Sequence, residues 1–264
     1  MCCLPDIAFA IHYLSRFQQS LGDVHIAAAK HLLVYLVHTR HLGLLFSATT
    51  ISNFGPTNMA SDGLQLYHDA TFAGEPSDSS SVSGVLAFLN GTPIYWHVGK
   101  VSYVTRSSTE SELWGADDAL AFLEQTRRLR TAAATLSPTL ALRLAEPCCT
   151  FTDNSALRDM LCSADDGVTR TMRHIRTRIH RLRDASRNNI LRSTWIPAQA
   201  MYADLLTKVN PAPLVSRLRS FMSSLTRHHA QLDRVHGDRP HIGIFLSSHA
   251  PSARTPRTHA RMGG

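Results

Sequence analysis

The dipeptide Asn90-Gly91 constrains the fold of this 264-residue chain more than any other feature. Asn-Gly favours the tight turn of a β-hairpin, and it stands between two runs rich in β-branched and aromatic residues, 81–90 and 92–98. A third run, 64–70, alternates apolar and polar residues and precedes them. We therefore predict three consecutive strands linked as hairpins.

The chain continues as alternating helix and strand patterns. Residues 107–130 have the periodicity of an amphipathic helix, and Ser107 and Glu110 fit a capping box, in which the glutamate reaches back to the Ser107 amide. Later patterns predict a linker at 131–147, a strand at 148–153, a short helix at 154–162, a basic helix at 169–186, a strand at 188–197 and a closing helix at 198–209. Together these elements predict an α/β fold with a five-stranded mixed sheet flanked by helices.

Two further helices are predicted before the first strand, over 5–21 and 24–40, with Asp23 as the cap of the second. A short strand is predicted at 42–48. From about residue 223 the composition shifts to Arg, His, Ser and Pro without periodicity, which is typical of a disordered tail. We predict three parts: an N-terminal two-helix extension over 1–46, a main domain over 62–212 and a basic tail over 223–264.

The composition narrows the class of protein. A net charge of +7 and a pI of about 9.5 suit a polyanionic partner. Five cysteines without metal-binding or disulfide spacing predict free thiols in a reducing compartment. No apolar run approaches the roughly 20 residues of a membrane-spanning helix, and the N-terminus lacks the basic region of a signal peptide. We expect an intracellular protein that uses neither a membrane nor a small-molecule cofactor.

Four acidic residues occupy comparable places in the predicted elements. Asp69 and Asp153 end two strands, while Glu112 and Asp204 lie in the first turns of two helices. Each aspartate alone has an ordinary explanation. Asp69 could be a turn residue, Asp153 with Asn154 could cap the following helix, and Asp204 could complement the dipole at a helix N-terminus. Four carboxylates that converge at one sheet edge would repel one another, and divalent cations relieve such repulsion. Two Mg²⁺ or Mn²⁺ ions there could clamp the attacking and leaving oxygens of a phosphodiester.

Seven motifs follow one another along the chain: D-A-T-F-A-G-E from Asp69, S-V-S-G from Ser81, P-I-Y-W from Pro93, S-S-T-E-S-E-L from Ser107, T-D-N-S-A-L from Thr152, a stretch from Met172 to Asp184, and W-I-P-A-Q-A-M-Y-A-D-L-L-T-K-V from Trp195. In this order they resemble the ribonuclease H domain of copia-type retrotransposon polyproteins. The stretch from Leu4 to Phe46 resembles the place where the reverse transcriptase ends and passes into that domain. The resemblance covers roughly residues 4–212.

The resemblance implies a ribonuclease H-like fold and a role for each acid. Asp69, Asp153 and an acid of the long helix would be primary metal ligands, with Asp204 the fourth, nearer the second ion. The substrate would be the RNA strand of an RNA–DNA hybrid, cut to leave a 3′ hydroxyl and a 5′ phosphate. The Y-x-D-D motif of the polymerase is absent from the sequence, so no polymerase activity is expected.

The metal ligand on the long helix is open between Glu112 and Glu110. Glu112 lies near the apolar stripe that must face the sheet, whereas Glu110 is turned further away and has the capping task. In related ribonuclease H domains the catalytic glutamate is followed by a large apolar residue, and Leu113 follows Glu112. We predict Glu112 as the ligand, with Glu110 as the second choice.

The basic helix and the segment before it carry six arginines, Arg170, Arg173, Arg176, Arg178, Arg181 and Arg183. A charge run is usually a solvated face, but beside a hybrid-cutting site contact with phosphates is favoured. We predict such contacts for the first five. His174 and His180 match positions of the family, and their role is open between packing or hydrogen bonding and catalysis.

Other polar and aromatic residues receive ordinary interpretations. Asp117 and Asp118 are predicted to lie on an exposed helix face without a role, and His68 is predicted to be structural. The three tryptophans, Trp96, Trp114 and Trp195, are predicted to belong to the core.

The sequence departs from the family pattern at several positions. The second aspartate of D-A-D-W is Thr71, its tryptophan is Phe72, and the acid of the H-I-D-I motif is Arg176. Many cellular ribonucleases H carry a histidine before the last aspartate, where this chain offers Gln199. The predicted function is metal-dependent hydrolysis of the RNA strand of RNA–DNA hybrids. The alternative is a catalytically decayed transposon fragment that binds nucleic acid without cleaving it.

Overall fold

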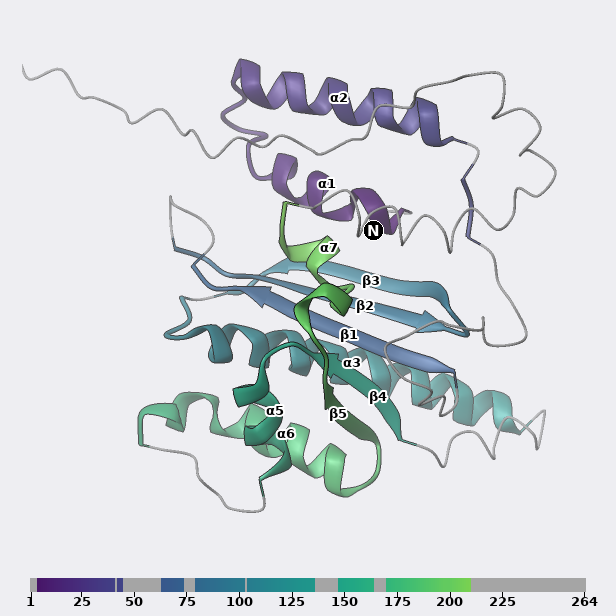
Figure 1. The fold of residues 1–264 in the computed structure, drawn as a ribbon, viewed down its shortest axis with the longest axis vertical. Coiled ribbons are helices and arrows are strands. Elements are labelled where there is room, and N and C mark those ends of the chain that lie inside the picture. The colour runs from purple at the N-terminus through teal and green to yellow at the C-terminus, as the bar shows by residue number, and fades with distance from the viewer. Residues whose placement is uncertain are drawn as a thin grey trace, which may run out of the picture.

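The computed structural model describes residues 4–40, 42–44, 63–73, 79–102, 104–135, 147–163 and 170–209. Its centre is a five-stranded sheet in the order β3-β2-β1-β4-β5 (Figure 1). The strands are β1 (Leu64–Thr71), β2 (Val82–Leu89), β3 (Thr92–Lys100), β4 (Cys148–Thr152) and β5 (Leu191–Trp195). Asn90 and Gly91 both have positive φ, 52° and 86°, as a tight hairpin turn between β2 and β3 requires. The predicted α/β fold with a five-stranded mixed sheet is confirmed.

Strand direction decides where the strand ends meet. β2 runs antiparallel to β1 and β3, whereas β1, β4 and β5 run parallel to one another. The C-terminal ends of β1, β4 and β5 therefore lie on the same side of the sheet, which we call the carboxyl edge. Residues at these three ends are placed close together although they are far apart in the sequence.

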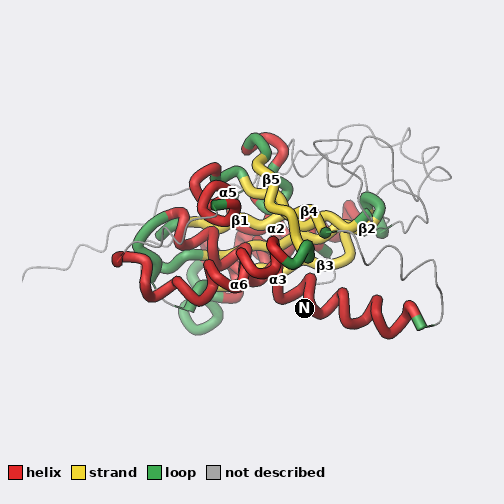
Figure 2. The backbone as a smooth tube through the Cα atoms, turned by 90° about the horizontal axis from the view of Figure 1, so that it is seen from below, coloured by secondary structure: helices red, strands yellow, loops and turns green. Residues whose placement is uncertain are grey.

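Helices cover both faces of the sheet (Figure 1). On one face lie α3 (Ser108–Ala134), α5 (Ser155–Cys162) and α6 (Arg176–Arg187), which follows the 3₁₀ turn η2 (Arg170–Ile175). On the other face lie α7 (Asp204–Thr207) and α1 (Ala8–Ser15), which follows the 3₁₀ turn η1 (Pro5–Ile7). α2 (Asp23–Thr39) lies beyond α1, away from the sheet. Figure 2, seen from below, shows α3 and α6 next to each other, in agreement with their direct packing.

Each face of the sheet carries its own apolar core. Successive side chains of β1 point to opposite faces, so Leu66 packs with Leu113 and Ile179 on one face, and Tyr67 packs with Phe88 and Tyr202 on the other. The alternating pattern of residues 64–70 is thus buried on both sides, because helices cover both faces.

Two glycines allow helices to approach the sheet closely beside the carboxyl edge. A Cβ atom at Gly115 would lie 3.1 Å from the carbonyl oxygen of Asp69, and a Cβ atom at Gly84 would lie 2.8 Å from Cβ of Leu206. α3 therefore packs tightly on β1, and α7 packs tightly on β2. These two contacts fix the helices that carry Glu112 and Asp204.

Four predicted helices are wrong in extent. The helix predicted at 198–209 is only the 3₁₀ turn η3 (Ala198–Ala200) and the four-residue α7, because Met201 is extended with ψ 96° and is buried together with Tyr202 and Ala203. The α-helix predicted over 5–21 ends at Ser15, and the basic helix begins as the 3₁₀ turn η2. The long helix continues to Ala134, into the predicted linker.

The N-terminal extension differs from expectation in detail. The helix predicted at 24–40 is α2, but its cap is Gly22 rather than Asp23. Much of its apolar stripe is exposed, with Ile26, Leu33 and Val37 at 44%, 62% and 61%. Residues 42–44 form no strand, and the rest of the strand predicted there lies outside the described residues, as does the tail over 223–264. The three-part division of the chain stays a prediction. In the part of the chain that the structure describes, every helix is too short or too polar to cross a membrane.

Candidate active site

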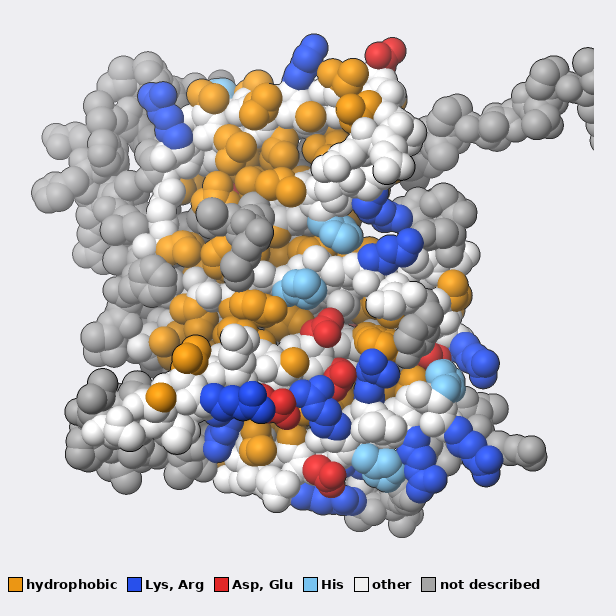
Figure 3. Space-filling view, turned by 180° about the vertical axis from the view of Figure 1, so that it is seen from behind, with side chains coloured by type: hydrophobic (Ala, Val, Ile, Leu, Met, Phe, Trp, Pro, Cys, Tyr) orange, Lys and Arg blue, Asp and Glu red, His pale blue; other side chains and the backbone are white. Residues whose placement is uncertain are grey.

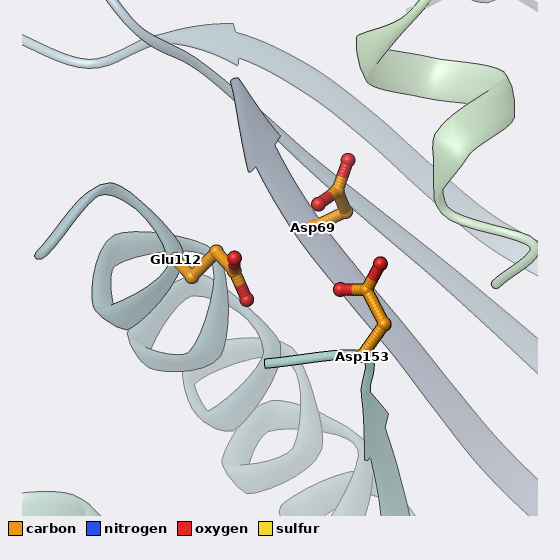
Figure 4. A group of neighbouring side chains, drawn as sticks. All are labelled: Asp69, Glu112 and Asp153. Atoms are coloured by element: carbon orange, nitrogen blue, oxygen red, sulfur yellow. The ribbon is translucent and has the colours of Figure 1, made fainter. Parts of the chain in front are cut away.

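Three of the four predicted acids meet at the carboxyl edge. Asp69 lies near the end of β1, Asp153 directly follows β4, and Glu112 lies in the second turn of α3. Figure 4 shows the three side chains around one space. One carboxylate oxygen of each lies within 4.8 Å of the others, and Asp69 and Glu112 are buried. We call these three residues the carboxylate group.

Neighbouring side chains fix the orientation of Glu112. The amide Nδ2 of Asn154 donates to Oε1 of Glu112 at 3.0 Å, and the hydroxyl of Thr152 donates to Oε2 at 3.2 Å. The other end of the same amide caps α5, because Oδ1 of Asn154 accepts from the Leu157 amide at 2.9 Å. The helix cap considered for Asp153 and Asn154 therefore belongs to Asn154, and the Asp153 carboxylate belongs to the carboxylate group.

Glu110 is buried but is engaged elsewhere. Its Oε2 accepts from the Arg106 amide, and its Oε1 lies next to Nε2 of His174, both at 2.9 Å. The Ser107 hydroxyl accepts from the Glu110 amide, as the capping box predicts, but the glutamate reaches the Arg106 amide instead of the predicted Ser107 amide. Of the two helix acids, the structure thus places Glu112 in the carboxylate group and Glu110 outside it.

Asp204 lies beside the carboxylate group rather than in it. The ammonium group of Lys208 lies 2.6 Å from Oδ1 of Asp204 and 3.4 Å from Oδ2 of Asp69, so it bridges the two acids. The Thr207 hydroxyl donates to Oδ2 of Asp69 as well. Neither Thr207 nor Lys208 was predicted as a site residue, although the spacing of Asp204 and Lys208, four apart at a helix, was a usable signal.

The pKa values of Glu112, Asp153 and Asp204 at this edge are all raised. Burial raises the pKa of Glu112 to about 7, and the charges of Asp69 and Asp153 add to this against the hydrogen bonds from Asn154 and Thr152. Burial and the Asp69 charge also raise the pKa of Asp153, and burial raises that of Asp204 to about 6. The protonated form of these acids is therefore favoured, even with Lys208 nearby.

The residues of the carboxylate group fit a hard divalent cation. Carboxylate oxygens are the ligands that Mg²⁺ and Mn²⁺ prefer, and a cation would offset both the burial of these charges and their mutual repulsion. The arrangement of Asp69, Glu112 and Asp153 is thus chemically suited to bind one such ion.

The predicted phosphate-binding arginines divide into two sets. Arg181 contacts Asp117 at 2.5 Å and Glu124 at 2.8 Å. Arg178 lies 3.3 Å from Asp117 and covers the ring of Trp114. The prediction that Asp117 is exposed and without a role is therefore wrong, because it ties α6 to α3. Figure 3, seen from behind, shows acidic and basic side chains interspersed over the lower part of the molecule.

The remaining arginines differ from this pattern. Arg173 and Arg176 are exposed, and Arg176 donates to Nε2 of His180 at 3.0 Å. The side chain of Arg170 lies outside what the structure describes. Arg183 is buried and donates to the carbonyl oxygen of Met160.

Three other expectations can be checked directly. Asp118 is half-buried and accepts from the Ser83 hydroxyl at 3.0 Å, so its predicted exposure is wrong. Trp195 is 47% exposed, not part of the core, and Trp96 and Trp114 are half-buried. His68 is fully buried, which lowers its pKa to about 4 and keeps it neutral, as a structural role requires.

Comparison with known proteins shows which proteins this chain is similar to in sequence. The chain is 30% identical over 205 residues to the retrovirus-related Pol polyprotein from transposon RE1 of Arabidopsis thaliana. It is a relative of the retrovirus-related transposon Pol polyproteins. The match covers 77% of this chain and 13% of that Pol polyprotein. The expected kinship with retrotransposon polyproteins is therefore confirmed.

Other similarities are more limited. Over 115 residues the chain is 35% identical to the secreted RxLR effector protein 161 of Plasmopara viticola. This match covers 44% of this chain and 74% of that protein. No family model matches. A solved N-terminal ribonuclease H domain from Mycobacterium tuberculosis is similar at 12% identity and a TM-score of 0.38, covering 60% of this chain and 96% of that one.

Proposed function

We propose that this chain is a metal-dependent nuclease that hydrolyses the RNA strand of RNA–DNA hybrids. The observation that carries the proposal is the carboxylate group, in which acids from β1, α3 and the end of β4 lie within 4.8 Å of one another. The similarity to transposon Pol polyproteins supports the choice of substrate, because the sequence motifs resemble the ribonuclease H domain of such polyproteins, which implies an RNA–DNA hybrid. An intracellular site of action stays a prediction.

Each residue of the site has a task in this proposal. Asp69, Glu112 and Asp153 would hold the divalent cation, and Asp204 would be a fourth ligand nearer a second ion. When bound, such ions supply Lewis-acid stabilisation of phosphodiester oxygens and lower the pKa of water. Asn154 and Thr152 hold both oxygens of Glu112 in place. Lys208 holds Asp69 and Asp204 together.

The test uses the full chain and a hybrid labelled on its RNA strand. We expect cleavage in Mg²⁺ or Mn²⁺, loss of cleavage with a chelator, and a loss on the order of 100-fold or more in Asp153→Asn, because a metal-site residue is removed. The matched control is Asp159→Asn, an exposed acid of α5 whose Oδ1 lies 3.0 Å from Nε of Arg158.

The outcomes separate the candidates. Cleavage that survives Asp153→Asn would exclude this site. Hybrid binding without metal-dependent cleavage by the unmodified protein would support the alternative, a fragment that binds nucleic acid without cutting it.

A further inference from the structure

Two aromatic rings in the described part of the chain are exposed, and both lie at the carboxyl edge. Phe72 and Trp195 are each 47% exposed. Every other Phe, Tyr or Trp side chain that the structure describes is buried or half-buried. Because burying a ring is normally favourable, two rings left in water at one edge of the sheet suggest a partner that covers them. We call Phe72 and Trp195 the aromatic rim.

The fold holds Trp195 against the carboxylate group. It ends β5 and lies opposite Thr152 in the parallel register, one residue before Asp153 on the neighbouring strand. Its indole Nε1 donates to the main-chain oxygen of Asp153 at 3.0 Å. The polar edge of the ring is therefore satisfied by the protein, and the exposed remainder is apolar surface in a fixed position.

Phe72 is placed by the end of β1. It directly follows Thr71, the last residue of that strand, and lies three residues after Asp69. The next residue, Ala73, adopts a left-handed backbone with φ 46°, and its amide donates to the Ser81 hydroxyl at 3.3 Å. The chain thus turns away immediately after Phe72 and leaves the ring outside the sheet.

The sheet order puts the two rings at the ends of the two strands that flank β4. β4, which leads into Asp153, lies between β1 and β5. Neighbouring strands are about 4.8 Å apart, so β1 and β5 are about 10 Å apart. That separation exceeds one nucleotide step of roughly 3.4 Å along a duplex strand, so the two rings would meet different nucleotides.

We propose that the aromatic rim packs against two sugars of an RNA–DNA hybrid, one on each side of the bond to be cut. The proposal rests on the proposed nuclease function and assigns the rim to substrate positioning. In a duplex the bases stay stacked, so a ring beside an A-like helix meets the sugars displayed in its wide, shallow minor groove. Stacking of the rings on bases would instead need a single strand.

The experiment measures binding and cleavage in rim variants of the full chain. We expect Phe72→Ala and Trp195→Ala each to raise the Kd for a hybrid about fivefold, the lower end of what aromatic contacts to nucleic acid lose on alanine substitution. The Kd is measured in an Asp153→Asn background, and KM and kcat in the unmodified background, where KM should rise and kcat should be retained. The control is Leu129→Ala, an apolar residue of α3 that is 68% exposed.

Further variants distinguish the ring from its hydrogen bond. Trp195→Phe keeps a ring but loses the N–H group, so we expect a Kd close to that of the unmodified protein. Hybrid binding should change the tryptophan fluorescence of the unmodified protein, and this change should be lost in Trp195→Phe. The fluorescence measurement does not depend on cleavage. If the rim residues contribute to hybrid binding but the unmodified protein does not cut the hybrid, the nuclease proposal is overturned and the binding role of the rim is supported.

Three results would overturn the proposal that the aromatic rim packs against sugars of the hybrid. The first is an unchanged Kd in both alanine variants. The second is an equal loss in Trp195→Phe and Trp195→Ala, which would assign the effect to the hydrogen bond on Asp153. The third is a larger loss for a single-stranded oligonucleotide than for the hybrid, which would assign the rings to base stacking.

Discussion

At the carboxyl edge the fold brings together three acids, while at the α3–α6 interface it pairs basic residues with acids. Burial and mutual repulsion raise the pKa of Glu112 to about 7 in the carboxylate group. Arg181, by contrast, has both Asp117 and Glu124 within 2.8 Å. In the sequence, the acids stood out by their places at the ends or starts of predicted elements, and the arginines stood out as one basic run.

The difference lies in whether the fold supplies the opposite charge. Like charges that the protein itself neutralises act in packing, as Arg178 and Arg181 do between α6 and α3. Like charges that are buried together without full compensation need an external partner of opposite sign. The predictions below test this distinction, beginning with the largest effect.

The largest effect should separate Glu112 from Glu110. Glu112→Gln keeps the size of the side chain but removes its charge from the carboxylate group, so we expect cleavage of the hybrid to fall on the order of 100-fold or more. Glu110→Gln changes a carboxylate that faces Arg106 and His174, so cleavage should stay within about fivefold, with a small loss of stability. Single-turnover rates of both variants in Mg²⁺ decide the question, and a reversed order of the two losses would make Glu110 the ligand.

The sequence was most informative where chemistry depends on strand ends. Asn90-Gly91 fixed the β2–β3 hairpin locally, and acids that end parallel strands must meet at one edge whatever the details of packing. For the same reason Asp69 and Asp153 were found together as predicted. The choice of Glu112 over Glu110 followed from helix periodicity, from the capping task of Glu110 and from the family resemblance, and the structure places Glu112 in the carboxylate group.

The sequence was least informative where a residue's environment comes from a distant element. Asp117 meets Arg181, which is 64 residues away, and no local pattern announces such a pair. The segment from Met201 to Ala203 was predicted as helix, but its three consecutive residues are buried and it leaves the helical conformation before α7 begins. Trp195 carries a large apolar side chain of the kind usually found in a core, and its exposure follows from its place at the end of β5.

The second prediction tests the paired charges at the α3–α6 interface. Asp117→Ala leaves both Arg178 and Arg181 without this partner in a half-buried place, so we expect a loss of about 2 kcal/mol in the free energy of unfolding. Chemical denaturation measures it. Asp159→Asn, on the exposed surface of α5, is the control and should change stability by less than about 0.5 kcal/mol. A loss no larger than that of the control would show that the pairing adds nothing.

The third prediction concerns pH and metal at the carboxylate group. Because the fold raises the pKa of Glu112 from 4.5 to about 7, its protonated form is favoured, and its stabilising contribution is present below pH 4.5 and lost as the pH rises through about 7. The metal-free protein should therefore lose stability over this interval, and Glu112→Gln should lose less. At pH 8, Mg²⁺ at ten times its Kd should add about 1.4 kcal/mol.

Thermal unfolding at pH 5 and pH 8, with and without Mg²⁺, checks this prediction. The Mg²⁺-induced rise in Tm should be larger at pH 8, where the carboxylates are ionised, and should shrink in Glu112→Gln. An equal rise in Tm at both pH values, or one that Glu112→Gln leaves intact, would place the Mg²⁺ elsewhere on the protein.

The smallest effect should separate two arginines only eight positions apart. Arg173 is exposed on η2, so Arg173→Ala should weaken hybrid binding by about three- to fivefold, lower the slope of log Kd against log salt by about one, and leave Tm unchanged. Arg181 is already paired with Asp117 and Glu124, so Arg181→Ala should lower Tm and leave the salt slope unchanged. Salt titrations of binding, run beside unfolding curves, measure both properties. Arg181→Ala could instead reduce the salt slope without lowering Tm. Such a result would show that a guanidinium paired within the protein still contacts phosphates. Internal ion pairs would then not distinguish arginines that act in packing from arginines that bind nucleic acid.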